Sequence, residues 1–200
     1  MIAGALAVLA RAVSGVSARW LSDPAGARQR IYFANHCSHL DFLVVWASLP
    51  PEVRVRTRPV AARDYWERGR LRRHLAERVF RGVLIDRAGA RNGANPVERM
   101  LSALDGGDSL ILFPEGTRGD GARVAEFRSG LYHLAAARSE VELLPVGIEN
   151  LNRVLPKGEA VPVPVISRLT FGRPLAICED EDKAAFLARA RRAVEELVGS

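Results

Sequence analysis

A histidine and an aspartate in the run Asn35-His36-Cys37-Ser38-His39-Leu40-Asp41 have the spacing of an acid–base pair. An imidazole acts as a general base when a carboxylate fixes its tautomer. His36 follows a predicted strand over 31–34, and Asp41 falls in the first turn of a predicted helix over 41–49, which brings it back towards His36. The pair could serve as the last two members of a Ser-His-Asp system, with a substrate hydroxyl replacing the serine.

Other interpretations of the same run stay open. Ser38-x-x-Asp41 is also a helix capping box, in which Asp41 accepts from backbone donors. A zinc site would take its ligands from His36, Cys37, His39 and Asp41, but a structural site needs four ligands in paired spacings, and the remaining cysteine and histidines offer no clear second pair. Cys37 could be a nucleophile, although adjacent side chains on an extended backbone point apart. We expect His39 to be orienting or structural.

A second polar cluster is Phe113-Pro114-Glu115-Gly116-Thr117-Arg118, which follows a predicted strand over 109–113. The backbone N–H groups of Gly116 and Thr117, the Thr117 hydroxyl and the Arg118 guanidinium could hold a phosphate. The Walker pattern is absent. Glu115 would be repelled by a phosphate unless it pairs with an arginine or accepts a hydrogen bond from a substrate hydroxyl. The alternative is an ordinary Pro-Glu-Gly turn.

A third cluster, Asp86-Arg87, follows the apolar run Gly82-Val83-Leu84-Ile85. Such a pair is commonly a local salt bridge, but at a shared edge with Arg118 the side chain of Arg87 becomes a second phosphate ligand. The carboxyl ends of parallel strands meet at one edge of a sheet, and active sites collect there. We therefore expect all three clusters to converge.

Alternating strands and helices predict a single α/β domain with a mixed, largely parallel sheet flanked by helices. Residues 1–22 are expected to form an apolar N-terminal helix that packs on the domain or lies on a membrane, followed by one domain over 23–200. Further predicted strands cover 53–57, 83–85, 143–148 and 165–171, and further helices cover 64–80, 129–137 and 182–198, with one more opened by Asn95-Pro96. Residues 161–164 are expected to be an extended connector.

Composition and charge narrow the class of protein. The 200 residues are 48% hydrophobic and 26% charged, which excludes a disordered chain, a coiled coil and a protein with several membrane spans. Two cysteines exclude a disulfide framework. The net charge of +6 comes from residues 51–92, with 12 arginines against 5 acidic residues, and it predicts an anionic partner. A lipid binder without enzymatic activity would have the same charge. Nucleic acid is disfavoured because few aromatic residues lie among the arginines.

In their order along the chain, these clusters resemble the motifs of the glycerolipid acyltransferases, typified by 1-acylglycerol-3-phosphate acyltransferase. His36-x4-Asp41 is similar to the first motif, residues 82–87 to the second, Phe113–Arg118 to the third, and Leu144-Pro145-Val146 to the fourth. Phe127-Arg128-Ser129-Gly130 resembles the segment after the third motif, where lysine is common in the family. The N-terminal segment is shorter than the family's usual membrane-associating helices.

The resemblance implies transfer of a fatty acyl group from acyl-CoA or acyl carrier protein to the free hydroxyl of 1-acylglycerol-3-phosphate, giving phosphatidate, or to another lysophospholipid or an aminolipid. His36 would be the base and Asp41 its partner, and the acceptor would be bound by Arg87, Glu115, Gly116, Thr117 and Arg118. No metal or other cofactor is implied. The expected partners are the two substrates and an anionic membrane surface, with the protein peripheral on the cytoplasmic side.

Overall fold

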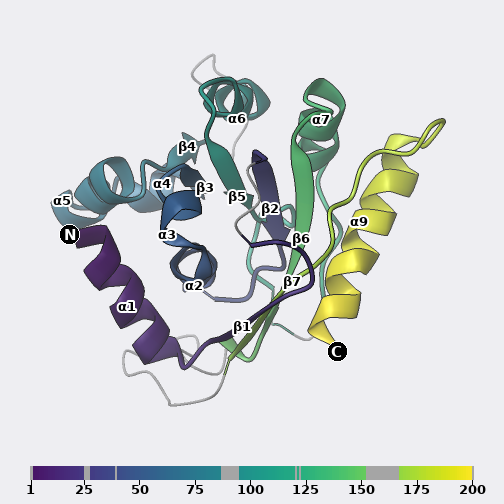
Figure 1. Ribbon diagram of the computed structural model, residues 1–200. Helices are drawn as coiled ribbons and strands as arrows, with labels where there is room; N and C mark the ends of the chain where they lie inside the picture. The colour runs from purple at the N-terminus through teal and green to yellow at the C-terminus, as the bar shows by residue number, and fades with distance from the viewer. Residues whose placement is uncertain are drawn as a thin grey trace.

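The centre of the protein is a mixed sheet in the order β1-β7-β6-β2-β5-β3-β4 (Figure 1). The structure is a computed structural model that describes residues 2–24, 28–38, 40–86, 95–119, 121, 123–151 and 167–199. All neighbouring strands are parallel except β6 and β7. The strands are β1 (Ser17–Trp20), β2 (Arg30–Ala34), β3 (Thr57–Ala62), β4 (Val83–Ile85), β5 (Ser109–Leu112), β6 (Glu142–Glu149) and β7 (Arg168–Phe171). The predicted fold class is confirmed.

Helices cover both faces of the sheet (Figure 1). One face packs against α6 (Pro96–Asp105), α7 (Gly130–Ala137) and α9 (Lys183–Val198). The other packs against α1 (Ile2–Ser14), α2 (Asp41–Ser48) and a π-helical turn, η1 (Leu75–Val79). Three short helices connect these elements: α3 (Pro51–Arg54), α4 (Arg63–Trp66) and α5 (Arg70–His74).

The central strand β2 is buried along its whole length, as its apolar sequence predicts. Ile31 and Phe33 enter the core under α6, α7 and α9, whereas Tyr32 and Ala34 enter the core under α1 and α2. Successive side chains of a strand point to opposite faces, so a strand that is covered on both faces is apolar throughout. Two cores therefore fix the position at which β2 ends, two residues before His36.

The predicted strand over 53–57 is wrong. Pro50 and Pro51 begin the short helix α3, with proline at its first position, and the strand starts only at Thr57. Arg54 is the last residue of α3, but its side chain contacts the end of α2. Its guanidinium donates to the carbonyls of Trp46, Ala47 and Leu49 at 3.1, 3.1 and 2.7 Å. The last carbonyls of a helix lack partners in the next turn, and a side-chain donor such as this guanidinium can satisfy them. The alternation of valine and arginine therefore does not mark a strand before Thr57.

The predicted helix over 64–80 is also corrected. It divides into α4, α5 and η1, with a break at Gly69, whose φ of +100° lies outside helical conformation. Glycine adopts positive φ without the steric penalty that a side chain brings. The apolar spacing along 71–79 gave no sign of this break.

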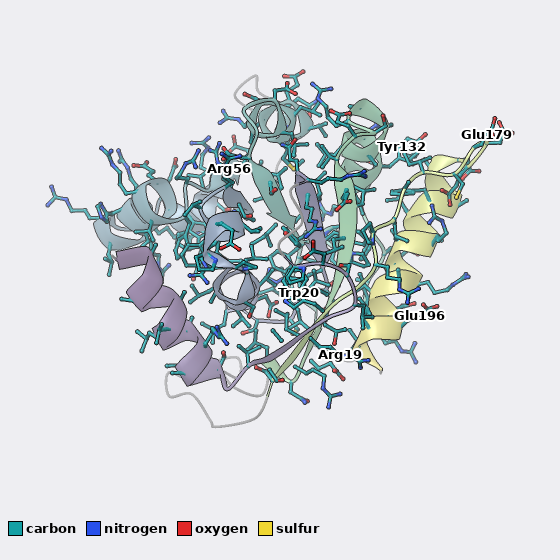
Figure 2. The ribbon with its side chains drawn as sticks, viewed as in Figure 1. Arg19, Trp20, Arg56, Tyr132, Glu179 and Glu196 are labelled. Atoms are coloured by element: carbon teal, nitrogen blue, oxygen red, sulfur yellow. The ribbon has the colours of Figure 1, made fainter. Side chains whose placement is uncertain are left out.

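The N-terminal helix is shorter than the expected segment 1–22. It ends at Ser14, whose carbonyl accepts from the Ser167 hydroxyl at 2.8 Å. Residues 17–20 form an edge strand that the sequence did not predict. Trp20 stacks on Phe171 with ring centroids 3.7 Å apart and is seen near the centre of Figure 2. Among the described residues, no helix is both long and apolar enough to cross a membrane. His39, Arg87 and the predicted connector 161–164 lie outside the described residues.

Candidate active site

The three polar clusters follow strands β2, β5 and β4, which run in the same direction because β2–β5, β5–β3 and β3–β4 are all parallel pairs. Their carboxyl ends therefore lie at one edge of the sheet, as predicted. β2 and β5 are neighbours, whereas β3 separates β5 from β4. Asp86, at the end of β4, lies with its carboxylate 3.3 Å from the Arg63 guanidinium. The first and third motifs are thus the ones that come together directly.

His36 and Asp41 form the pair that their spacing predicts. Nδ1 of His36 lies 2.7 Å from Oδ2 of Asp41. Asp41 is fully buried, while the imidazole is 19% exposed and stacks on Phe113 with ring centroids 4.4 Å apart. A carboxylate can only accept, so Nδ1 carries the proton and Nε2 is left with its lone pair. This is the tautomer that a general base requires.

The carboxylate of Asp41 is also oriented by the backbone. Oδ2 accepts from the N–H groups of Cys37 and Ser38 at 2.7 and 2.8 Å, in addition to His36. The bond to Ser38 has the spacing of a capping box, although Leu40 is the N-cap of α2 and makes no side-chain cap hydrogen bond. The catalytic interpretation of the pair stays a prediction. Two fixed amide donors hold the carboxylate in place before a substrate arrives, and the imidazole is aligned with it.

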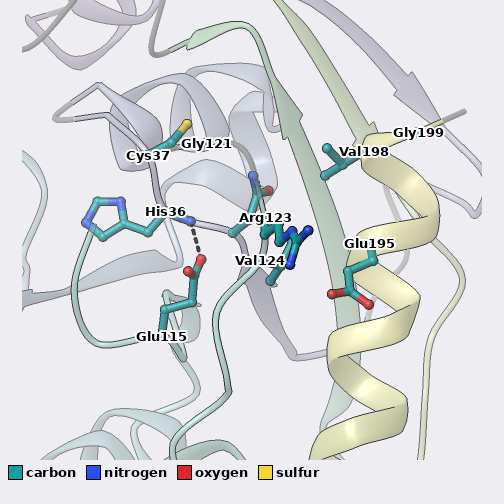
Figure 3. Close-up of a pocket in the computed structure, with 10 residues that line it drawn as sticks. His36, Cys37, Glu115, Gly121, Arg123, Val124, Glu195, Val198 and Gly199 are labelled. Carbon is teal, nitrogen blue, oxygen red and sulfur yellow. Dashed lines mark hydrogen bonds between the residues drawn. The ribbon is translucent and has the colours of Figure 1, made fainter. Parts of the chain in front are cut away.

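The backbone of His36 is held from both sides by the third motif. Its N–H donates to Oε1 of Glu115 at 2.7 Å, and its carbonyl accepts from the N–H of Gly119 at 2.8 Å. Figure 3 shows the bond between Glu115 and His36. The side chain and both backbone groups of His36 thus have partners within the site. The sequence alone does not indicate the hydrogen bonds to the His36 backbone, because they depend on how two loops meet in the fold.

Glu115 has a positioning role that sequence analysis did not predict. Its second oxygen, Oε2, accepts from the N–H of Ala125 at 2.9 Å, and the residue is only 4% exposed. Burial raises the pKa of Glu115, while the two backbone hydrogen bonds act in the opposite direction. The carboxylate joins the first motif, the third motif and the segment after it. Its predicted contact with the glycerol part of an acceptor stays a prediction.

The turn after Glu115 presents the other predicted binding residues. Gly116 has a φ of +70°, which favours glycine, and Thr117 and Arg118 are exposed to solvent. A Cβ atom on Gly116 would lie 2.5 Å from Nε of Arg128, so the side chain of Arg128 covers this glycine. In the sequence, Arg128 stood out only as part of the segment Phe127–Gly130 that follows the third motif. The short distance between this segment and the third motif was the signal that could have indicated a contact.

A cavity of about 240 Å³ lies beside the motifs, between Cys37, Arg123 and the end of α9. In Figure 3 the imidazole of His36 points away from Val124 and Val198, which line this cavity. The thiol of Cys37 lies 3.8 Å from Oδ1 of Asp41. Within the described parts of the chain, no group of three or more histidine, cysteine, aspartate or glutamate side chains is placed to hold a metal ion.

An imidazole oriented by a buried aspartate lies beside a basic turn at the carboxyl ends of parallel strands, an arrangement suited to general-base chemistry. The family model described as Acyltransferase matches residues 22–149, and the chain belongs to this family. The predicted family is therefore confirmed.

Two groups of curated proteins are similar to the chain. The 1-acyl-sn-glycerol-3-phosphate acyltransferase of Limnanthes alba is 32% identical over 145 residues, which are 69% of this chain and 48% of that protein. The lyso-ornithine lipid O-acyltransferase of Rhizobium meliloti (strain 1021) is 31% identical over 121 residues, 60% of this chain and 38% of that protein. The chain therefore spans about half of the length of the Limnanthes alba protein, and a smaller share of other curated relatives.

A solved structure has the same fold. The 1-acyl-sn-glycerophosphate acyltransferase PlsC of Thermotoga maritima superimposes with a TM-score of 0.74 at 20% sequence identity. The match covers all of this chain and 79% of that one. At this identity the likeness establishes the arrangement of the elements and no more.

Proposed function

We propose that the protein transfers a fatty acyl group from a thioester, acyl-CoA or acyl carrier protein, to the free hydroxyl of 1-acylglycerol-3-phosphate, giving phosphatidate. The observation that carries the proposal is the 2.7 Å contact between His36 and a fully buried Asp41, with Nε2 available. Two relatives with lyso-lipid activities in their names support the class of acceptor.

The chemistry follows from the geometry of His36. Nε2 takes the proton of the acceptor hydroxyl while its oxygen attacks the thioester carbonyl, because an aliphatic hydroxyl is a poor nucleophile by itself. The tetrahedral intermediate collapses, the carbon–sulfur bond breaks, and the thiolate takes the proton from the imidazolium. Asp41 stabilises the imidazolium between these steps. The base returns to its starting form, and the products are the ester and the free thiol.

The acceptor phosphate is proposed to bind at the turn Gly116-Thr117-Arg118, with Arg87 as a further ligand and Glu115 near the glycerol. Arg118 is exposed at the edge where His36 lies, and Glu115 and Gly119 tie its turn to the His36 backbone. An arginine fork binds phosphate oxygens in a bidentate manner. An aminolipid acceptor is the second candidate, because the lyso-ornithine lipid enzyme is nearly as similar as the glycerolipid enzymes.

We further propose that the protein is peripheral on an anionic membrane surface, on its cytoplasmic side. α1 exposes Val8 and Leu9 at 70% and 58%, and α5 exposes Leu71 at 71% among arginines. In Figure 1 the start of α1 and α5 lie on the same side of the molecule. Apolar side chains with adjacent cations favour the interface of an anionic bilayer. The exposed arginines of this region are Arg68, Arg70, Arg72, Arg73 and Arg78.

The test is an assay of the purified protein with acyl-CoA and a panel of acceptors: lysophosphatidate, lysophosphatidylcholine and lyso-ornithine lipid. Thiol release gives the rate, and mass spectrometry identifies the acylated product. We expect lysophosphatidate to be the preferred acceptor, and His36→Ala to lower kcat by about 10²–10⁴-fold or more. Asp41→Asn should also be severe.

His133→Ala is the matched control, because His133 is an exposed histidine of α7 away from both motifs. It should transfer acyl groups as the unsubstituted protein does, and all variants should keep their helical circular dichroism. Near-normal turnover by folded His36→Ala would refute the assignment. Preference for lyso-ornithine lipid would replace the proposed acceptor and leave the mechanism intact.

A further inference from the structure

The space over Gly116 is filled by the side chain of Arg128. A Cβ atom at Gly116 would lie 2.5 Å from Nε and 2.8 Å from both Cδ and Cζ of Arg128. Real Cβ atoms do not approach other heavy atoms so closely, so any side chain at position 116 displaces the guanidinium. The N–H of Arg128 donates to the carbonyl of Pro114 at 2.9 Å, which fixes the start of its side chain against the turn.

Among the described residues, the guanidinium of Arg128 has no anionic partner. Several other arginines are paired, such as Arg58 with Asp108 and Arg189 with Glu181. In the part of the chain that the structure describes, no carboxylate lies within ion-pair distance of Arg128. Glu115, which precedes Gly116, is buried and bonded to two backbone amides. Arg128 therefore places a positive charge on the turn that none of the described carboxylates neutralises.

The same turn adjoins the base. Glu115 and Gly119, on either side of Gly116 in sequence, hydrogen-bond to the N–H and the carbonyl of His36 at 2.7 and 2.8 Å. In a lysophosphatidate the phosphate and the reacting hydroxyl are separated by only a few bonds. An acceptor with its hydroxyl at Nε2 of His36 needs a cation for its phosphate near this turn, and Arg128, which lies over Gly116, is a candidate for it.

We propose that Arg128 binds the acceptor phosphate together with Arg118, with its guanidinium lying in the space that Gly116 leaves open. The inference rests on the proposed function and adds to it the residue that selects phosphate-bearing acceptors. An arginine fork and a second cation hold a phosphate with more geometric specificity than one cation alone.

The test is a double-mutant cycle with Arg128→Ala, Gly116→Ala and both together, assayed with lysophosphatidate and with monoacylglycerol, which lacks the phosphate. Loss of a charge-assisted hydrogen bond corresponds to roughly a 10–100-fold rise in KM for lysophosphatidate. We expect that rise for Arg128→Ala, with kcat and the use of monoacylglycerol nearly unchanged. Arg128→Lys should restore part of the loss, because it keeps the charge without the fork.

Gly116→Ala should raise the same KM, but should have little further effect once Arg128 is alanine, apart from the strain at positive φ. The matched control is Arg192→Ala, which removes an exposed arginine of α9. The inference would be overturned if the rise in KM of the double variant equalled the product of the rises in the two single variants. An unchanged KM for Arg128→Ala would also overturn it. So would an equal loss with both acceptors.

Calorimetric titration with glycerol 3-phosphate separates this inference from the proposed function, because binding needs no acyl transfer. Binding that weakens in Arg128→Ala supports the phosphate site even if the protein transfers no acyl group. Absence of binding to the unsubstituted protein overturns the inference, whatever the activity with other acceptors.

Discussion

Replacing Glu115 by glutamine changes one atom of the clamp around His36 and distinguishes two roles for this residue. Both carboxylate oxygens accept from backbone N–H groups, of His36 at 2.7 Å and of Ala125 at 2.9 Å. A glutamine has one acceptor oxygen, so its NH₂ group must face one of the two amides as a second donor. Glu115→Gln therefore loses one charge-assisted hydrogen bond in a buried place and leaves a donor unpaired.

The magnitude follows from that count. Hydrogen bonds to charged groups contribute about 1.5–3 kcal/mol, and we expect the free energy of unfolding to fall by this amount. For a chain of this size each kcal/mol lowers Tm by roughly 2–4 °C, so the expected decrease is about 3–12 °C. Activity should fall through kcat, because the backbone that carries the base loses an anchor, while KM for lysophosphatidate stays near its normal value.

The assay combines thermal unfolding with steady-state kinetics on the same preparations. Glu126→Gln is the control, since Glu126 is exposed in the following segment and should change neither Tm nor kcat. An unchanged Tm with a raised KM for lysophosphatidate would refute the positioning role. It would show instead that Glu115 contacts the acceptor.

Three other changes have defined outcomes. Cys37→Ser should keep near-normal acyl transfer, because the thiol lies beside Asp41 rather than in line with a reacting carbonyl; an acylated Cys37 trapped by mass spectrometry would contradict direct transfer. Gly147→Ala should lower Tm markedly, because its Cβ would lie 2.6 Å from Cβ and 2.8 Å from the backbone carbon of Leu197 in α9; an unchanged Tm would show that α9 can shift. The Arg189 guanidinium lowers the pKa of Glu181 to about 2. The ion pair therefore stabilises the fold at every pH above the pKa that Glu181 has in the unfolded chain, and this stabilisation is lost as the pH falls through about 2. Glu181→Gln should therefore lower Tm at neutral pH, with a difference that disappears in acid, and a constant difference would contradict this linkage.

The sequence predicted the strands that are buried on both faces of the sheet and the helix whose start has a local capping signal. β2 and β6 are apolar because each contacts two cores, and α6 begins at Asn95 and Pro96 with the Asn95 side chain accepting from Val97 N–H at 3.0 Å. β1 was missed because its four residues are exposed or half-buried and lie at the edge of the sheet. Its pairing depends on a strand far away in the chain.

The site divides in the same way. The His36–Asp41 pair follows from local geometry, a strand end and the first helical turn, so six residues of sequence contain it. The contacts of Glu115 and Arg128 depend on where backbone amides of one loop face the side chains of another. Residue types do not encode such directions, so the sequence predicted an acceptor contact for Glu115 and gave no sign of its two backbone partners.

The pairing of β1 with β7 joins the first strand of the chain to the last and affects how the protein folds as the ribosome makes it. The bond from the Ser167 hydroxyl to the Ser14 carbonyl spans 153 residues. α1 can pack on α2 early in synthesis, but β1 has no partner until β7 has emerged. Closing so long a loop is slow, and unpaired strand edges are prone to aggregate. We therefore expect a nascent chain stalled before residue 168, which carries β1 unpaired beside the apolar helix α1, to aggregate more readily than a chain that includes β7.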